Sequence, residues 1–190
     1  MELKITCAKS SGFCFGVKRA ITIALDTAKK SRETQTRIEM LGDIVHNEDV
    51  VRSLQEAGIQ KIGRLGKGTG KSLLIRAHGA GKKMIFQAKQ RGYMIVDATC
   101  PMVKEIHGIV CSLEKNGYRI IIIGDQAHDE VKGILGQLEH KAFVLDKIQE
   151  IEKLPKKMGK VAVVLQSTQN LEKISRSEEH TSELQSRITI

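Results

Sequence analysis

The chain has 190 residues, of which 41% are hydrophobic and 3% aromatic, and its formal net charge is +9 at pH 7. This length suffices for one large or two small domains with a buried core. Apolar runs such as residues 120–123 are too short to cross a bilayer, and the N-terminal segment alternates like a strand. We therefore expect a cytoplasmic protein with no signal peptide and no membrane partner.

Short runs rich in isoleucine and valine predict seven strands, at residues 2–8, 37–41, 72–77, 93–97, 118–123, 142–145 and 160–165. Apolar residues at helical spacing predict helices over 17–30 and 101–116. Pro101 suits the first position of the second helix, which makes Thr99 or Cys100 its N-cap, and Asn116-Gly117 suits its end. Strands that alternate with helices predict α/β layers with mainly parallel sheets.

Three sequence patterns recur in the same order in both halves of the chain. CFGVK at 14–18 is echoed by CPMVK at 100–104, and LGDIVHNEDV at 41–50 is echoed by IGDQAHDEV at 123–131. The third echo pairs LLIRAHGA with VAVVLQSTQ, each a strand that ends in polar residues. We therefore predict two related α/β units, residues 1–97 and residues 98–175.

The four cysteines fall into two classes. Cys7 lies on the apolar face of a predicted strand and Cys111 on a predicted helix, and both suit a core position. Cys14 and Cys100 instead stand at predicted helix starts, where free N–H groups and the helix dipole favour a thiolate. Because ligand sites in parallel sheets lie beyond the strands' carboxyl ends, we expect both thiols to share one site with several histidines.

Three chemistries suit such a site. A zinc site with cysteine and histidine ligands has no local chelating pair to support it, since no C-x-x-C motif is present. A cysteine nucleophile with a histidine base does not explain two equivalent cysteines. An iron–sulfur cluster fits best, because its thiolates can come from separated helix starts, and a further cysteine is then needed beyond the one that each unit supplies.

Five blocks of the sequence, SGFCFGVKRAI, VHNEDVV, IRAHGA, DATCPMV and HDEVKGILGQ, resemble the signature blocks of the 4-hydroxy-3-methylbut-2-enyl diphosphate reductase family. The resemblance covers about residues 1–174 and corresponds to the N-terminal two-thirds of the family. It implies a trefoil of three α/β units around a 4Fe–4S cluster held by three cysteines. It also implies an enzyme of the non-mevalonate isoprenoid route, which reductively removes an allylic hydroxyl to give isopentenyl and dimethylallyl diphosphates.

The resemblance assigns ligand roles to five residues. Cys14 and Cys100 match the first two cluster ligands. His46 and His78 match histidines that contact the substrate diphosphate, to which an imidazole can offer N–H donors. His128 matches a residue of the same pocket.

The resemblance also implies the groups that transfer protons and electrons. Glu130 matches the acid that relays a proton to the leaving hydroxyl, and Ser167 and Thr168 stand in QST where the family usually has Q-T-T. The substrate is a small allylic diphosphate, and the implied electron donor is a protein such as ferredoxin or flavodoxin.

The third unit of the family, with its cluster cysteine, has no counterpart in this chain. The polar stretch RSEEHTSELQS is a translation of DNA that looks like a common sequencing adapter, so we predict that residues 176–190 are a non-native tail. Because the chain carries two of the three cluster ligands and lacks one wall of the pocket, we expect the chain as written to be inactive.

The alternative reading is a basic nucleic-acid-binding α/β protein with structural cysteines. The positive charge is spread along the chain rather than gathered in an arm, and Tyr93 and Tyr118 are the only tyrosines in a chain without tryptophan. Stacking platforms for bases are therefore scarce, and we expect no nucleic-acid partner. The segment GRLGKGTGKS at 63–72 resembles a phosphate-binding loop, but a strand rather than a helix is predicted after it.

Overall fold

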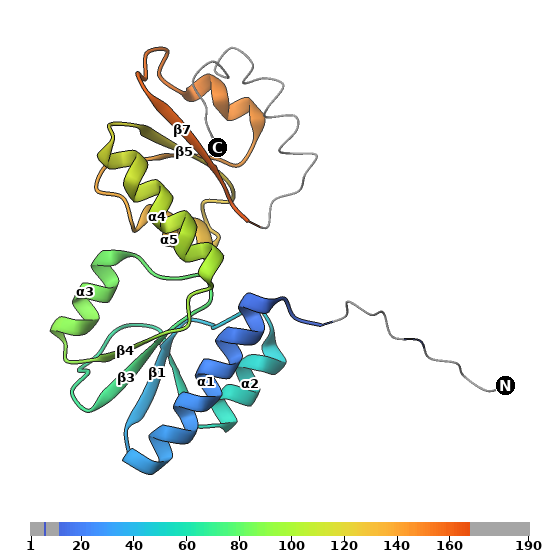
Figure 1. Cartoon of the computed structure of the whole chain (residues 1–190), viewed down its shortest axis with the longest axis vertical. Helices are drawn as coiled ribbons and strands as arrows, with labels where there is room; N and C mark the ends of the chain where they lie inside the picture. Colours follow the sequence, from blue (N-terminus) through green and yellow to red (C-terminus); the bar gives the residue numbers. More distant parts are fainter. Residues whose placement is uncertain (1–5, 7–11, 168–190) are drawn as a thin grey trace.

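The structure is a computed structural model that describes residue 6 and residues 12–167. Cys7, Thr168, the predicted tail and nearly all of the predicted strand at 2–8 lie outside the described residues. The described part forms two α/β units, each a parallel sheet with its helices, which we call the first layer and the second layer. They follow one another along the long axis of the molecule (Figure 1). The predicted boundary at residues 97 and 98 falls between the last strand of the first layer and the first helix of the second.

The first layer is a four-stranded sheet in the order β2-β1-β3-β4, with every neighbouring pair parallel. Its strands are β1 (Arg37–Leu41), β2 (Ile59–Ile62), β3 (Lys71–Ile75) and β4 (Met94–Asp97). Its helices are α1 (Phe15–Thr34), α2 (Glu48–Glu56) and α3 (Lys82–Gln90). Helices α1 and α2 lie on one side of the sheet and α3 on the other (Figure 1).

Burial on both faces explains the continuous apolar run at the end of the central strand β3. In β3, Leu74 packs into the cluster beneath α1 and α2, whereas Leu73 and Ile75 pack into the cluster beneath α3. Helix α1 presents Ala20 and Ala24 to the first cluster, and both are fully buried. Small side chains at four-residue spacing let this helix lie close against the sheet.

The second layer is a three-stranded parallel sheet in the order β6-β5-β7. Its strands are β5 (Arg119–Ile123), β6 (Phe143–Leu145) and β7 (Val161–Leu165). Its helices are α4 (Pro101–Lys115), α5 (Asp129–Leu135) and the 3-10 helix η1 (Ile148–Lys153). Ile120 and Ile122 face the cluster that contains Val110 of α4, whereas Ile121 faces the opposite cluster.

The predicted fold class is confirmed: the chain is an α/β protein with parallel sheets. Pro101 opens α4 behind the N-cap Cys100, and Gly117 takes the left-handed conformation with φ 78° just after the helix, as predicted. Strand β3 follows the loop-like segment at 63–70, also as predicted. Strand β2 was missed, because its two middle residues are exposed and polar and it is only an edge strand.

Two loops hold the layers together. Gly81 and Gly136 lie in backbone contact, and a Cβ added to Gly136 would stand 2.5 Å from the Cα of Gly81. The N–H of Lys82 donates to the Gly136 carbonyl at 2.9 Å, and the amide of Gln137 donates to the Ala80 carbonyl at 2.8 Å. The AHGAGK segment of the first layer is therefore fixed to the end of α5. Among the described helices, none combines the length and apolar character needed to cross a membrane.

Candidate functional site

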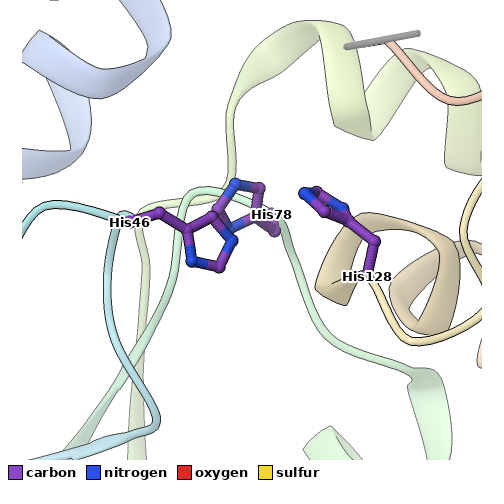
Figure 2. Close-up of side chains that lie close together, drawn as sticks. All are labelled: His46, His78 and His128. Atoms are coloured by element: carbon purple, nitrogen blue, oxygen red, sulfur yellow. The ribbon is translucent and has the colours of Figure 1, made fainter.

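Three histidines converge beyond the carboxyl ends of the strands (Figure 2). His46 follows β1, His78 follows β3, and His128 follows β5. Their ring centroids are 4.6 Å apart for His46 and His78, 5.4 Å for His46 and His128, and 5.5 Å for His78 and His128. The first layer thus supplies two imidazoles and the second layer the third, as expected when the carboxyl ends of the strands of both sheets face one site.

Two of these histidines stand at helix starts. His46 precedes Asn47, the N-cap of α2, whose side chain accepts from the N–H of Val50 at 2.9 Å. His128 is itself the N-cap of α5, and its Nδ1 accepts from the N–H of Glu130 at 3.2 Å. With Nδ1 engaged as an acceptor, the proton of a neutral His128 lies on Nε2.

His78 is held as a neutral imidazole. Burial, followed by the neighbouring rings of His46 and His128, lowers its pKa from 6.5 to about 4. Its Nδ1 is buried and has no hydrogen-bond partner among the described residues. Arg76, two residues earlier, is paired with Asp129 through a 2.6 Å contact that bridges β3 and α5.

The two predicted cluster thiols also meet. Cys14 is the N-cap of α1 and Cys100 the N-cap of α4, and neither side chain caps its own helix. A Cβ placed on Gly16 would stand 2.5 Å from the sulfur of Cys100 and 4.0 Å from that of Cys14. Both sulfurs therefore lie beside one point that only glycine leaves open, at the N-termini of two long helices. This donor set fits a group that binds thiolates, because helix N-termini stabilise negative charge.

A network of bonds positions the Cys100 turn. The N–H of Cys100 donates to the carbonyl of Ala77, the residue before His78, at 2.9 Å. Arg19 of α1 donates to the carbonyl of Thr99 at 3.1 Å. Burial works to raise the pKa of Asp97, but hydrogen bonds from Lys104 and Thr99 outweigh it, so its pKa lies below the usual range. The turn that carries Cys100 is therefore hydrogen-bonded both to α1 and to the loop that carries His78.

Glu130 lies in the second layer, 1% exposed, two residues after His128. One of its oxygens accepts from the backbone N–H of Ser167 at 2.7 Å, and the other lies 2.8 Å from the Ser167 hydroxyl. Gln166, just before Ser167, accepts from the N–H of Asp125 at 3.0 Å through its side chain. The end of β7 thus holds the buried carboxyl at the start of α5.

The model of the LytB protein family matches residues 5–189. The chain belongs to the LytB protein family. The family predicted from the sequence blocks is thereby confirmed. The match includes all eight residues that the sequence analysis singled out for the site.

Curated relatives of this LytB chain include several 4-hydroxy-3-methylbut-2-enyl diphosphate reductases. The chain is 42% identical over 158 residues to the 4-hydroxy-3-methylbut-2-enyl diphosphate reductase of Caldanaerobacter subterraneus. The match covers 80% of this chain and 54% of the relative. The chain is 40% identical over 172 residues to the reductase of Pelobacter propionicus, and the match covers 90% of this chain and 60% of that relative. The chain therefore spans a little over half the length of these relatives.

Two solved structures share the fold. A structure of (E)-4-hydroxy-3-methyl-but-2-enyl diphosphate reductase, described as the terminal enzyme of the non-mevalonate pathway, matches with a TM-score of 0.81 and 33% identity, over 95% of this chain and 63% of that one. The structure of the corresponding reductase from Plasmodium falciparum matches with a TM-score of 0.86 and 28% identity, over 95% of this chain and 56% of that one.

One histidine of this LytB chain escaped the sequence analysis. The ring of His107 in α4 is wedged between the two layers: a Cβ on Gly79 would stand 2.7 Å from its Cε1, and one on Gly133 would stand 3.4 Å from its Nε2. That Nε2 is buried without a hydrogen-bond partner among the described residues, and burial lowers the pKa of His107. Its helical spacing from the buried Val103 and Val110 was the available signal, since it places a polar ring on the buried face.

Proposed function

We propose that this chain forms the N-terminal part of a reductase that removes the hydroxyl of 4-hydroxy-3-methylbut-2-enyl diphosphate. The observation that supports the proposal is a LytB chain in which three histidines lie together, with Cys100 bonded to the residue before His78 and Glu130 bonded to His128. Relatives that bear this enzyme's name support the substrate class.

The histidine cluster supplies the contacts for the diphosphate. A neutral imidazole donates one N–H, and phosphate oxygens are strong acceptors. The Nε2–H of His128 is free to donate because its Nδ1 is occupied by Glu130. His78 stays neutral at pH 7, so it binds as a hydrogen-bond donor rather than as a cation. The chain's net charge of +9 attracts a polyanionic substrate over a longer range.

Cys14 and Cys100 would hold an iron–sulfur cluster of the 4Fe–4S type, with the third thiolate supplied by the portion of the relatives that this chain does not span. When bound, such a cluster would pass the two electrons that the reaction consumes from the electron donor to the substrate, one at a time. The implied electron donor is a small redox protein of the ferredoxin or flavodoxin class. In this reading the chain on its own is inactive, because two thiolates hold a cluster less firmly than three.

Glu130 provides the acid. Reductive removal of the hydroxyl consumes two electrons and two protons and releases water. The Glu130 carboxyl is excluded from bulk water and held by Ser167 on both oxygens, so it can deliver a proton at a fixed place. The Ser167 hydroxyl is placed to pass a replacement proton to this carboxyl, and Thr168 is proposed to assist it.

The decisive experiment compares two glutamates in a protein completed with the C-terminal part of a curated relative and reconstituted anaerobically. Glu130→Gln keeps the shape but carries no transferable proton, so turnover should fall about 100-fold or more while cluster absorbance persists. Glu48→Gln is the matched control, because Glu48 occupies the corresponding motif of the first layer but is exposed. Near-normal turnover of the Glu130→Gln protein would contradict the role.

A further inference from the structure

Arg76 belongs to the turn that carries His78. Its carbonyl accepts from the N–H of Gly79 at 3.0 Å, which closes the turn around His78. The N–H of Ala77 donates to the carbonyl of Ile44 at 3.1 Å, and Ile44 lies in the loop after β1. The backbone therefore connects the two loops of the first layer that supply histidines.

The Arg76 side chain extends this connection to the second layer. Its Nη1 lies 2.6 Å from Oδ2 of Asp129, the residue that follows His128 at the start of α5. The two side chains are 22% and 21% exposed, so water screens this ion pair less than a pair on the open surface. A Cβ added to Gly42, the residue after β1, would stand 3.0 Å from the same nitrogen, so the guanidinium also lies against the loop that supplies His46.

The position of His128 depends on contacts between the two layers. Among the described residues no strand of one sheet pairs with a strand of the other, so loops and side chains set the distance from His128 to the other two rings. The far end of α5 is fixed to the first layer through the bonds of Gly136 and Gln137. The Arg76–Asp129 pair is a second attachment, at the start of α5 and next to the ring that the second layer supplies.

We propose that Arg76 is a positioning residue, which holds His128 through Asp129 beside the two histidine rings of the first layer. The inference rests on the proposed function, since it assumes that the three rings donate together to a diphosphate. Donors that are held at a fixed spacing bind a ligand more tightly than donors that must first be brought together.

Direct contact of Arg76 with the phosphate is the competing role, and it predicts a change of opposite sign. If Arg76 were a ligand, Asp129→Asn would free its charge and remove a negative charge near a polyanion, so phosphate would bind more tightly. If Arg76 acts by position, Asp129→Asn releases His128 and phosphate binds more weakly.

The test uses the chain itself and two measurements that do not need turnover. Nuclear Overhauser contacts between ring protons report the spacing of the three histidines, and calorimetry at pH 7.5 reports the binding of inorganic pyrophosphate. Arg76→Gln and Asp129→Asn should each remove most of the contacts that His128 makes with the other two rings. The contact of His46 with His78, within the first layer, should persist. Each variant should also bind pyrophosphate at least about 5-fold more weakly, the lower end of the usual coupling between two sites.

An exposed ion pair of the first layer supplies the matched controls. Arg52 and Asp49 stand 3.7 Å apart within α2, and their side chains are 68% and 89% exposed. Arg52→Gln and Asp49→Asn make the same chemical changes and should alter neither measurement. Lys132 lies 3.9 Å from Asp129, so Arg76→Gln leaves this carboxylate a neighbouring cation and the variant should fold.

The outcomes separate the positioning role from the proposed function. Unchanged ring contacts in Arg76→Gln or Asp129→Asn, or loss of the first-layer contact together with the others, would overturn the positioning role. Tighter pyrophosphate binding by Asp129→Asn would overturn it as well and would make Arg76 a direct phosphate ligand. If the ring contacts change as expected but the parent chain does not bind pyrophosphate, the positioning role stands and the diphosphate role of the histidines fails.

Discussion

The two layers of this protein begin a helix with the same motif and use it differently. His46-Asn47-Glu48 opens α2 of the first layer, and His128-Asp129-Glu130 opens α5 of the second. In the first layer Asn47 is the N-cap, whereas in the second layer His128 is.

This shift of one residue in the cap has a large consequence. Glu48 becomes the first residue of its helix and is exposed, whereas Glu130 becomes the second residue and is 1% exposed. Successive helical residues point about 100° apart, so one position separates a solvent-facing carboxylate from a buried one. The end of β7 then supplies Ser167 as its partner. The comparison teaches that the helix phase, rather than the motif, decides which glutamate is buried.

The largest expected effect is the loss of bound iron when the cysteine at the helix start of either layer, Cys14 or Cys100, is replaced. In the completed, reconstituted protein, Cys14→Ser or Cys100→Ser should remove most of the bound iron, because a serine hydroxyl is a poor ligand for iron where a thiolate is required. Cys111→Ser is the control, since the Cys111 thiol accepts from Lys82 and donates to the Gln137 carbonyl, away from the sulfur pair of Cys14 and Cys100. Iron and sulfide analysis gives the result, and equal iron loss in the Cys111 variant would remove the distinction.

The next largest expected effect is a loss of folding stability when the junction between the two layers is disturbed. Gly136→Ala places a Cβ 2.5 Å from the Cα of Gly81, and backbone cannot move aside as a side chain does, so we expect a loss of about 1–3 kcal/mol or more. Gly108→Ala, inside α4 with nothing within 4 Å, should instead stabilise by about 1 kcal/mol. Urea unfolding gives the free energy of unfolding of the two variants. Similar values for both variants would show that the contact between Gly81 and Gly136 does not hold the layers together.

The two glutamates should also differ in stability. Glu130→Gln replaces the acceptor of two Ser167 bonds by an amide with one accepting oxygen, so one of the two bonds is lost at a cost of about 0.5–1.5 kcal/mol. Glu48→Gln, an exposed change, should stay within about 0.5 kcal/mol. Thermal and chemical unfolding of the chain as it exists provides the comparison, and an equal response of both positions would argue that Glu130 is not held as described.

The last expected effect is a pH dependence that arises from His78. Its pKa is about 4 when folded and near 6.5 when unfolded, so the unfolded chain binds more protons between these values. Stability is therefore fully present above about pH 6.5 and is lost as the pH falls through about 4. His78→Asn should flatten this dependence in part, because burial gives His107 a lowered pKa of the same sign. Unfolding measured from pH 7.5 to 4 would contradict the burial of His78 if both proteins showed the same slope.

Much of the scaffold was readable from the sequence because it depends on local chemistry. Alternating apolar runs predicted six of the described strands, and Pro101 and Gly117 marked the ends of α4. The short echoes around Cys14 and Cys100 predicted two helix starts, since a helix N-terminus is set by the residues that flank it. The order of the strands within each sheet was not readable, because β1 lies between β2 and β3 through contacts distant in sequence.

Only the tertiary structure decided which polar residues are buried together. The sequence presents His46-Asn47-Glu48 and His128-Asp129-Glu130 as equals, and the fold distinguishes them through the N-cap and the end of β7. His107 is an ordinary helical residue in the sequence, yet contacts from Gly79 and Gly133 of separate layers enclose its ring. The physical reason is that burial depends on what packs against a side chain, and these neighbours come from segments far apart in the chain.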